Sequence, residues 1–149
     1  IGAKTVIGQE CTISAFQHVS IGRECIVADR VMLIDFDHGV TEEERPIRLQ
    51  GIYKRDVNVG HNCWIGYGAC ILRGATAADN AIIGTSTVVT KDLPANAVAG
   101  GVPARILRMR DEPETLRGAW AADERQRGRV GARGSPLLRT RAVESSGSG

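Results

Sequence analysis

Aromatic residues are scarce in this chain, since Phe, Trp and Tyr together make up 4% of its 149 residues. A core with so few rings is expected to be narrow and built from stacked Ile, Val and Ala. No apolar run reaches the roughly 18 residues that a membrane-spanning helix needs. The formal net charge of +2 is too small to indicate a nucleic-acid partner. These absences favour a single domain with an aliphatic core.

An apolar residue returns at every sixth position between residues 57 and 93, with a small or apolar residue four places after it. Neither the 3.6-residue period of a helix nor the two-residue period of a half-buried strand explains this spacing. A period of six is typical of a parallel β-helix, in which each hexapeptide is one short strand and one corner. We expect the leading side chain to point inward and the Gly that often follows it to permit an unusual backbone conformation. The leading residues are Val59, Ile65, Ile71, Ala77, Ile83 and Val89, and the fifth-place residues are Cys63, Ala69, Ala75, Ala81, Thr87 and Leu93.

The same period covers residues 1–35, except that it slips by two residues after Ile13. With three hexapeptides per turn, the chain is expected to hold about four coils. Cys11, Cys25 and Cys63 fall at the small fifth place, and the four cysteines form no C-x-x-C pair. We therefore expect these cysteines to be core residues rather than disulfides or metal ligands.

The period stops at Phe36 and returns near Val57, and the segment 36–56 is charged and aperiodic. Long loops of this kind inside compact domains are commonly functional, so we predict a functional excursion loop. The run of three Glu and one Arg at 42–45 is interpreted as a solvated face. After Leu93, Pro and Gly residues are expected to end the strand pattern.

The repeat domain is predicted to cover residues 1–110 and to be followed by a tail, residues 111–149. Pro113 could start a short helix, and the Ser- and Gly-rich end is expected to be disordered. The chain begins at Ile1, inside a repeat and without Met, so we expect it to be part of a longer protein.

Four segments resemble the left-handed β-helix hexapeptide acyltransferases, in particular the maltose, galactoside and xenobiotic O-acetyltransferases. They are Asp37-His38-Gly39, Cys63-Trp64-Ile65-Gly66, the stretch 82–94 and the stretch 100–106. Their order and spacing match the family over residues 1 to about 110. The resemblance implies an all-β fold of left-handed coils and the transfer of an acetyl or other short acyl group from coenzyme A to a hydroxyl.

The same resemblance implies that His38 is the general base. Imidazole suits this role because its unperturbed pKa of about 6.5 lies near neutrality. Either Asp35 or Asp37 is expected to orient the ring, as carboxylates orient bases elsewhere. A backbone N–H of the β-helix wall would stabilise the developing oxyanion.

Acetyl-coenzyme A is the implied co-substrate, and a further set of residues is implied to bind it. Trp64 and Gly66 would line the wall, and the backbone at Gly84 and Thr85 would bind the pantetheine arm. Basic and hydroxyl side chains match the expected partners of the coenzyme phosphates. These phosphate-binding candidates are Thr90, Lys91 and Arg105.

Several alternatives stay open at this point. The acyl acceptor could be an amino group of an amino sugar instead of a hydroxyl, or the chain could be a non-catalytic trimeric scaffold. A zinc enzyme on the same fold would need three converging His ligands, and the chain holds only His18, His38 and His61, widely spaced. We expect no metal, a cytoplasmic location and a homotrimer whose sites lie between subunits and take small-molecule substrates.

Overall fold

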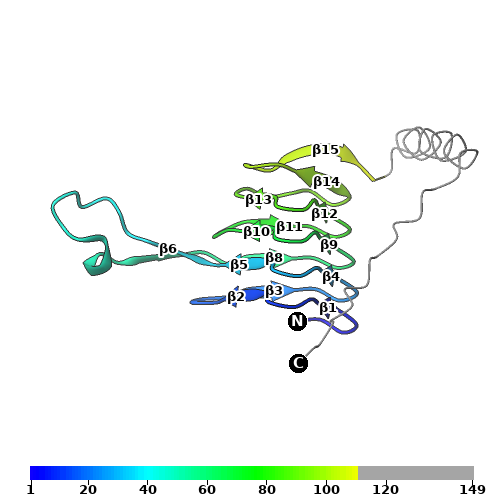
Figure 1. Cartoon of the computed structure of the whole chain (residues 1–149), viewed down its shortest axis with the longest axis horizontal. Coiled ribbons are helices and arrows are strands. Elements are labelled where there is room, and N and C mark those ends of the chain that lie inside the picture. Colours follow the sequence, from blue (N-terminus) through cyan, green and yellow to red (C-terminus); the bar gives the residue numbers. More distant parts are fainter. Residues whose placement is uncertain (111–149) are drawn as a thin grey trace, which may run out of the picture. The chain divides into compact units, whose positions relative to one another are not determined.

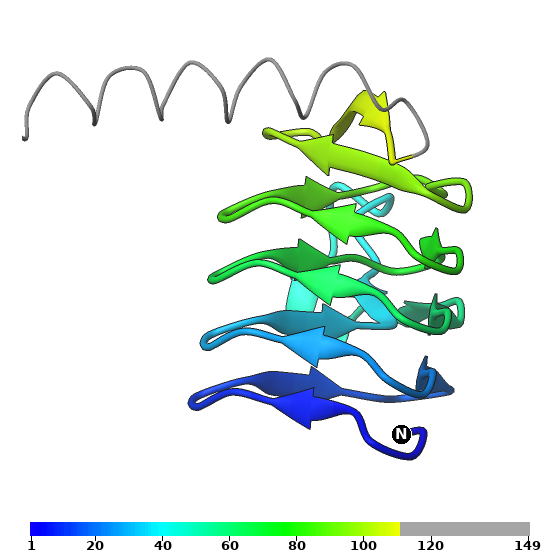
Figure 2. The ribbon, with the colours of Figure 1, turned by 90° about the vertical axis from the view of Figure 1, so that its right-hand side faces the viewer.

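Short parallel strands stack into three sheets in the computed structural model, which describes residues 1–110 (Figures 1 and 2). The parallel strands of sheet A are β1 (Val6–Ile7), β4 (Ile26–Val27), β9 (Trp64–Ile65), β12 (Ile82–Ile83) and β14 (Ala97–Gly100). Those of sheet B are β2 (Thr12–Ser14), β5 (Met32–Ile34), β10 (Cys70–Ile71) and β13 (Val88–Val89). Those of sheet C are β3 (Val19–Ile21), β8 (Val57–Val59) and β11 (Thr76–Ala77). The chain visits the sheets in the order A, B, C and repeats. The result is a parallel β-helix with hexapeptide coils. The helix and disordered end predicted for the tail lie outside the described residues.

Four coils follow one another along the chain, as the period predicts. The strands β1–β2–β3, β4–β5–β8 and β9–β10–β11 form the first three. The fourth consists of β12, β13 and a parallel bridge from Leu93 to Ala77. Parallel pairing in register, for example Ile26 with Trp64 and Trp64 with Ile82, places equivalent hexapeptide positions above one another.

The strand pattern does not end after Leu93, so that expectation is wrong. β14 begins a fifth turn, and β15 (Arg105–Met109) pairs with it in antiparallel fashion. Ala97 and Ala99 are buried and alternate with half-exposed residues, which continues the inward pattern of sheet A despite the Pro and Gly residues around them. The last hairpin therefore covers the upper edge of sheet A. No helix among residues 1–110 is long and apolar enough to cross a membrane.

The leading residues of the hexapeptides form the core. Ile65 and Ile71 are 0% exposed and Ile83 is 1% exposed, which confirms the predicted common interior. Full burial of one such aliphatic side chain contributes about 1.5–3 kcal/mol. Because each coil buries its aliphatic side chains only against the coils above and below, the stability of the fold depends on stacking.

Several fifth-place residues are small and also donate side-chain hydrogen bonds to backbone carbonyls of the coil above. Thr5 Oγ1 donates to the carbonyl of Gly22 at 2.6 Å, and Cys25 Sγ donates to the carbonyl of Gly60 at 3.1 Å. Cys63 Sγ makes the same contact with Ala78 at 3.3 Å. Cys25 and Cys63 are buried core residues, as predicted, and all four cysteines are free thiols.

The buried thiols are expected to be unreactive. Burial raises the pKa of Cys63 from 9.0 to about 11, and Cys25 is also fully buried. At pH 8 this shift lowers the thiolate fraction of Cys63 about a hundredfold, and the thiolate is the reactive form. We predict that a disulfide reagent modifies Cys25 and Cys63 at least about a hundredfold more slowly in native protein than in guanidinium, with mass spectrometry identifying the sites. Modification of Cys63 at the rate of the denatured protein would contradict this packing.

The glycines that follow the leading residues have a different role from the one predicted. Gly22, Gly60 and Gly66 are absent from the set of residues with positive φ, which occur instead two places later in the hexapeptide, as at Glu24 and Asn62. A Cβ on Gly22 would lie 2.3 Å from the carbonyl oxygen of Gly60 in the coil above. These positions need glycine because two backbones approach each other closely at the corner.

The segment predicted as an aperiodic loop is an antiparallel hairpin. β6 (Phe36–His38) pairs with β7 (Ile52–Lys54), and the 3-10 helix η1 (Ile47–Leu49) lies between them. This hairpin, residues 36–54, projects sideways from the stack in Figure 1 and is called the arm below.

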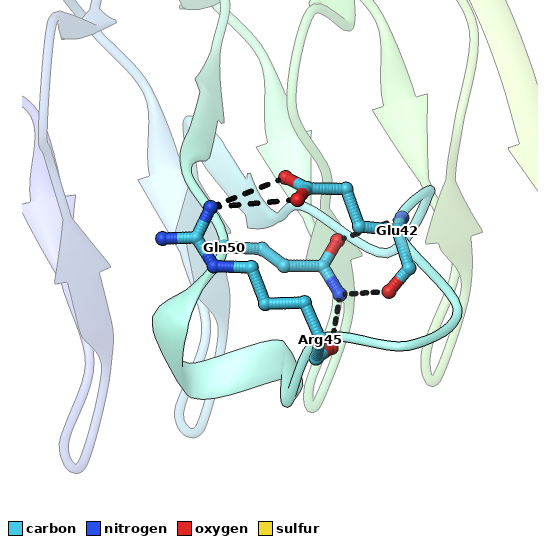
Figure 3. Close-up of polar contacts among 3 residues, drawn as sticks. All are labelled: Glu42, Arg45 and Gln50. Carbon is cyan, nitrogen blue, oxygen red and sulfur yellow. Dashed lines mark hydrogen bonds and ion pairs between the residues drawn. The ribbon is translucent and has the colours of Figure 1, made fainter.

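The tip of the arm closes on the amide of Gln50, which is 9% exposed (Figure 3). Gln50 Nε2 donates to the carbonyls of Glu42 at 3.0 Å and Arg45 at 2.8 Å, and its Oε1 accepts the Glu42 N–H at 3.1 Å. Glu42 and Arg45 also form an exposed ion pair at 3.4 Å. The tip therefore has a defined shape, with Glu43 and Glu44 facing solvent.

Candidate active site

The arm leaves the β-helix at the corner between sheets B and C. The same corner holds residues 15–18 in the first coil, 72–74 in the third and 90–92 in the fourth. We call this stack the B–C corner. His38 ends β6 and its side chain is exposed, so the arm presents an accessible imidazole next to this corner.

Asp35 stands at the start of the arm and is completely buried. Its carboxylate accepts backbone N–H groups of Phe16 at 2.7 Å and of Gln17 and His18 at 2.6 Å each. Burial alone would raise the pKa of Asp35, but these N–H donors outweigh it and lower that pKa. The ionised carboxylate therefore stabilises the fold above its unfolded pKa, and this contribution is lost as pH falls through the folded pKa.

The Asp37 carboxylate instead forms an ion pair with a residue of the third coil. Arg73 Nε lies 2.6 Å from Asp37 Oδ2, which ties the base of the arm to the B–C corner. In the described part of the chain neither Asp35 nor Asp37 hydrogen bonds to the His38 ring, because both carboxylates are engaged elsewhere. Arg73 was missed by the sequence reasoning, although stacking the hexapeptides at their period would have placed it above the arm.

Lys91 and Arg105, two of the residues predicted to bind the coenzyme, line one open cavity of about 370 Å³ beside the B–C corner. Asp92, Leu93, Ala104 and Ile106 complete its lining. Thr90 precedes Lys91 on the same corner and is exposed. Both cationic side chains are exposed, which suits a phosphate-bearing ligand.

The other predicted coenzyme residues lie elsewhere. Trp64 is 53% exposed on the outer face of sheet A, and Gly66, Gly84 and Thr85 form the corner between sheets A and B. The N–H groups of Gly66 and Gly84 already donate to the carbonyls of Ile83 at 2.7 Å and Ala99 at 2.8 Å. The exposed Thr85 is the more accessible part of that corner.

Within one chain the candidate residues therefore form two groups on different edges of the prism. His38, Asp35, Asp37, Thr90, Lys91 and Arg105 lie at or beside the B–C corner, whereas Trp64, Gly66, Gly84 and Thr85 belong to sheet A and the A–B corner. Sheet B separates the two groups.

The histidines do not converge on a metal. Among residues 1–110 no group of three His, Cys, Asp or Glu side chains could hold an ion. The ring of His61 is engaged in the fold, since its Nδ1 accepts the backbone N–H of Arg23 at 3.1 Å.

Known acetyltransferases are similar to this chain in sequence and in fold. A probable acetyltransferase of Mycobacterium tuberculosis is 31% identical over 142 residues, which cover 95% of this chain and 45% of that protein. The galactoside O-acetyltransferase of Escherichia coli is 41% identical over 91 residues, which cover 60% of this chain and 43% of that protein. The chain thus spans less than half the length of these two relatives. No known family profile matches it.

A solved structure of a galactoside acetyltransferase in complex with coenzyme A superimposes with a TM-score of 0.64 and 34% identity. The match covers 75% of this chain and 58% of that one.

Proposed function

The chain belongs to the left-handed β-helix family of hexapeptide-repeat acyltransferases, and on this premise we propose that it moves an acetyl or other short acyl group from coenzyme A to a small acceptor. The acceptor is a hydroxyl of a sugar or related molecule. The observation that carries this proposal is the exposed His38 on an arm held at the corner where Lys91 and Arg105 line a cavity.

In the proposed reaction, His38 removes the proton from the acceptor hydroxyl. The oxygen attacks the thioester carbonyl, the C–S bond breaks and the acyl group passes to the acceptor. The coenzyme leaves as a thiolate, which needs little acid assistance because a thiol has a pKa of about 8.5, and the thiolate then takes the proton from the His38 imidazolium. Exposure of the imidazole supports this role, because a general base must reach the proton that it removes.

The separation of the two groups of candidate residues supports a site between copies of the chain. We propose a homotrimer in which the arm and B–C corner of one copy face Trp64 and Thr85 of the next. Sedimentation at micromolar concentration tests this arrangement, and a monomer that still turns over acetyl-coenzyme A would contradict it. A cytoplasmic location belongs to the same proposal, since free thiols persist in reducing compartments.

The activity is tested by mixing the protein with acetyl-coenzyme A and a panel of sugars and amino sugars. Release of free thiol that depends on a sugar hydroxyl supports the proposal. Release only with amino sugars would assign N-acylation instead. No release with any acceptor, together with no binding of coenzyme A, would identify a non-catalytic scaffold.

Lys91 is proposed to contact a coenzyme phosphate. We predict that Lys91→Ala raises the KM for acetyl-coenzyme A about tenfold and leaves the KM for the acceptor unchanged. A tenfold change is the effect expected from the loss of one charge-assisted hydrogen bond. The matched control is Lys4→Ala, because Lys4 forms an exposed ion pair with Glu24 in the first coil, and exposed pairs contribute little. Equal effects of both changes would indicate a general loss of positive charge rather than a contact.

A further inference from the structure

The first coil contains a corner that is two residues longer than the period requires. Ile21 follows the leading residue Ile13 by eight positions instead of six, and residues 15–18 make the turn between β2 and β3. The three N–H groups of Phe16, Gln17 and His18 converge on the buried carboxylate of Asp35. A buried carboxylate that accepts three backbone donors fixes the corner, because moving the corner would leave these groups unpaired.

This fixed corner holds an aromatic ring against the arm. The ring of Phe16 meets the ring of Phe36 edge to face, with 5.4 Å between centroids and 62° between planes. Phe36 meets the imidazole of His38 at 6.4 Å and 86°. The ammonium of Lys54, which pairs with Phe36 across the hairpin, lies 5.4 Å from the centre of the Phe16 ring. Aromatic rings prefer such edge-to-face contacts, so each ring restricts the rotation of the next.

The imidazole itself has few other restraints. In the part of the chain that the structure describes, no hydrogen bond engages the His38 imidazole, and this side chain is exposed. The edge-to-face contact with Phe36 is therefore the aromatic restraint on the imidazole. Phe36 in turn packs edge to face against Phe16, a residue of the extended corner.

We propose that the extended corner is a buttress for His38, in which Asp35 fixes residues 15–18 and Phe16 braces Phe36 behind the imidazole. Asp35 and Phe16 are positioning residues that act on His38 through other groups. The proposal rests on the proposed function of His38 as the base. It replaces a direct carboxylate–imidazole contact with a chain of contacts that begins in the preceding coil.

Phe16→Leu and Phe16→Tyr test the buttress with little risk to the fold, because Phe16 is 56% exposed. Leu removes the ring, whereas Tyr keeps it. Val6→Ala is the control, since Val6 is a similarly exposed apolar residue of the first coil outside the corner. The chain has three His, so the imidazole protons of His38 can be assigned in an NMR spectrum by their loss in His38→Gln.

We expect Phe16→Leu to shift the His38 ring resonances and to leave those of His61 in place, while Phe16→Tyr and Val6→Ala preserve both. Unchanged His38 resonances in Phe16→Leu would overturn the buttress whatever the enzyme does. This measurement needs no activity, so it separates failure of the buttress from failure of the proposed function.

Kinetics supply the second test. Phe16→Leu is expected to lower kcat roughly tenfold or more with an unchanged KM for acetyl-coenzyme A, because a misplaced base slows the chemical step. In a His38→Ala background the same change should cost nothing further. A full additional loss in that background would overturn the proposal and make Phe16 a direct contact of the acceptor. Full activity of His38→Ala itself would refute the base and leave the NMR result to decide the buttress.

Discussion

His38→Ala is expected to lower kcat about 10²- to 10⁴-fold while the affinity for coenzyme A stays the same. The reason is that in the proposed reaction the imidazole acts on the acceptor proton, whereas the candidate contacts for the coenzyme phosphates lie in the cavity of Lys91 and Arg105. Steady-state release of thiol gives kcat, and calorimetric titration with coenzyme A gives the affinity. Together the two measurements separate loss of chemistry from loss of binding.

His61→Asn is the matched control for this experiment. His61 is also exposed, but it lies at the corner after β8, and its ring accepts a backbone N–H from the coil below. Asn places an oxygen near the position of Nδ1 and can accept the same hydrogen bond, so near-normal kcat is expected. A general base is expected to accelerate the reaction at least about 10²-fold. If His38→Ala kept more than about a tenth of the activity, this imidazole could not be the base.

Gly22→Ala is expected to destabilise the protein by about 3 kcal/mol or more, or to prevent folding. The added methyl group would lie 2.3 Å from the carbonyl oxygen of Gly60 and 2.5 Å from Nδ1 of His61. The oxygen belongs to the backbone of the next coil, so the clash is relieved only by separating two coils. Such a separation would also stretch the hydrogen bond of 2.8 Å from the Gly22 N–H to Val59.

Gly51→Ala provides the comparison, because a Cβ at Gly51 would meet nothing within 4 Å. Its stability in urea is expected to match the unsubstituted protein within about 0.5 kcal/mol. Equal stability of the two variants would mean that the corner glycines do not mark the closest approach of the coils.

Much of the β-helix could be predicted because a six-residue period fixes which side chains point inward. Ile65, Ile71 and Ile83 were assigned to one interior on that basis and are buried there. The left-handed sense came from the family resemblance and not from the period. The reason for the corner glycines was predicted wrongly, because the sequence shows that a glycine is present but does not show which atoms of the next coil lie close to it.

The arm and its support could not be derived in the same way. The pairing of Phe36 with Lys54 and the contacts of Asp35 with residues 16–18 occur where the six-residue period is interrupted. Such contacts depend on where an irregular segment leaves the stack. Asp35 was one of two carboxylates expected to orient the imidazole by analogy with other bases, but its carboxylate accepts N–H groups from a corner of the previous coil.

Placing the arm at a corner lets its length change at little thermodynamic cost. Parallel neighbours are 18 positions apart across Trp64 and Ile82, but 38 apart across Ile26 and Trp64, where the arm intervenes. The longer closure costs only about 0.7 kcal/mol of chain entropy, since this term grows with the logarithm of loop length. The residues between β6 and β7 can therefore be lengthened, shortened or exchanged while the stacked coils stay intact.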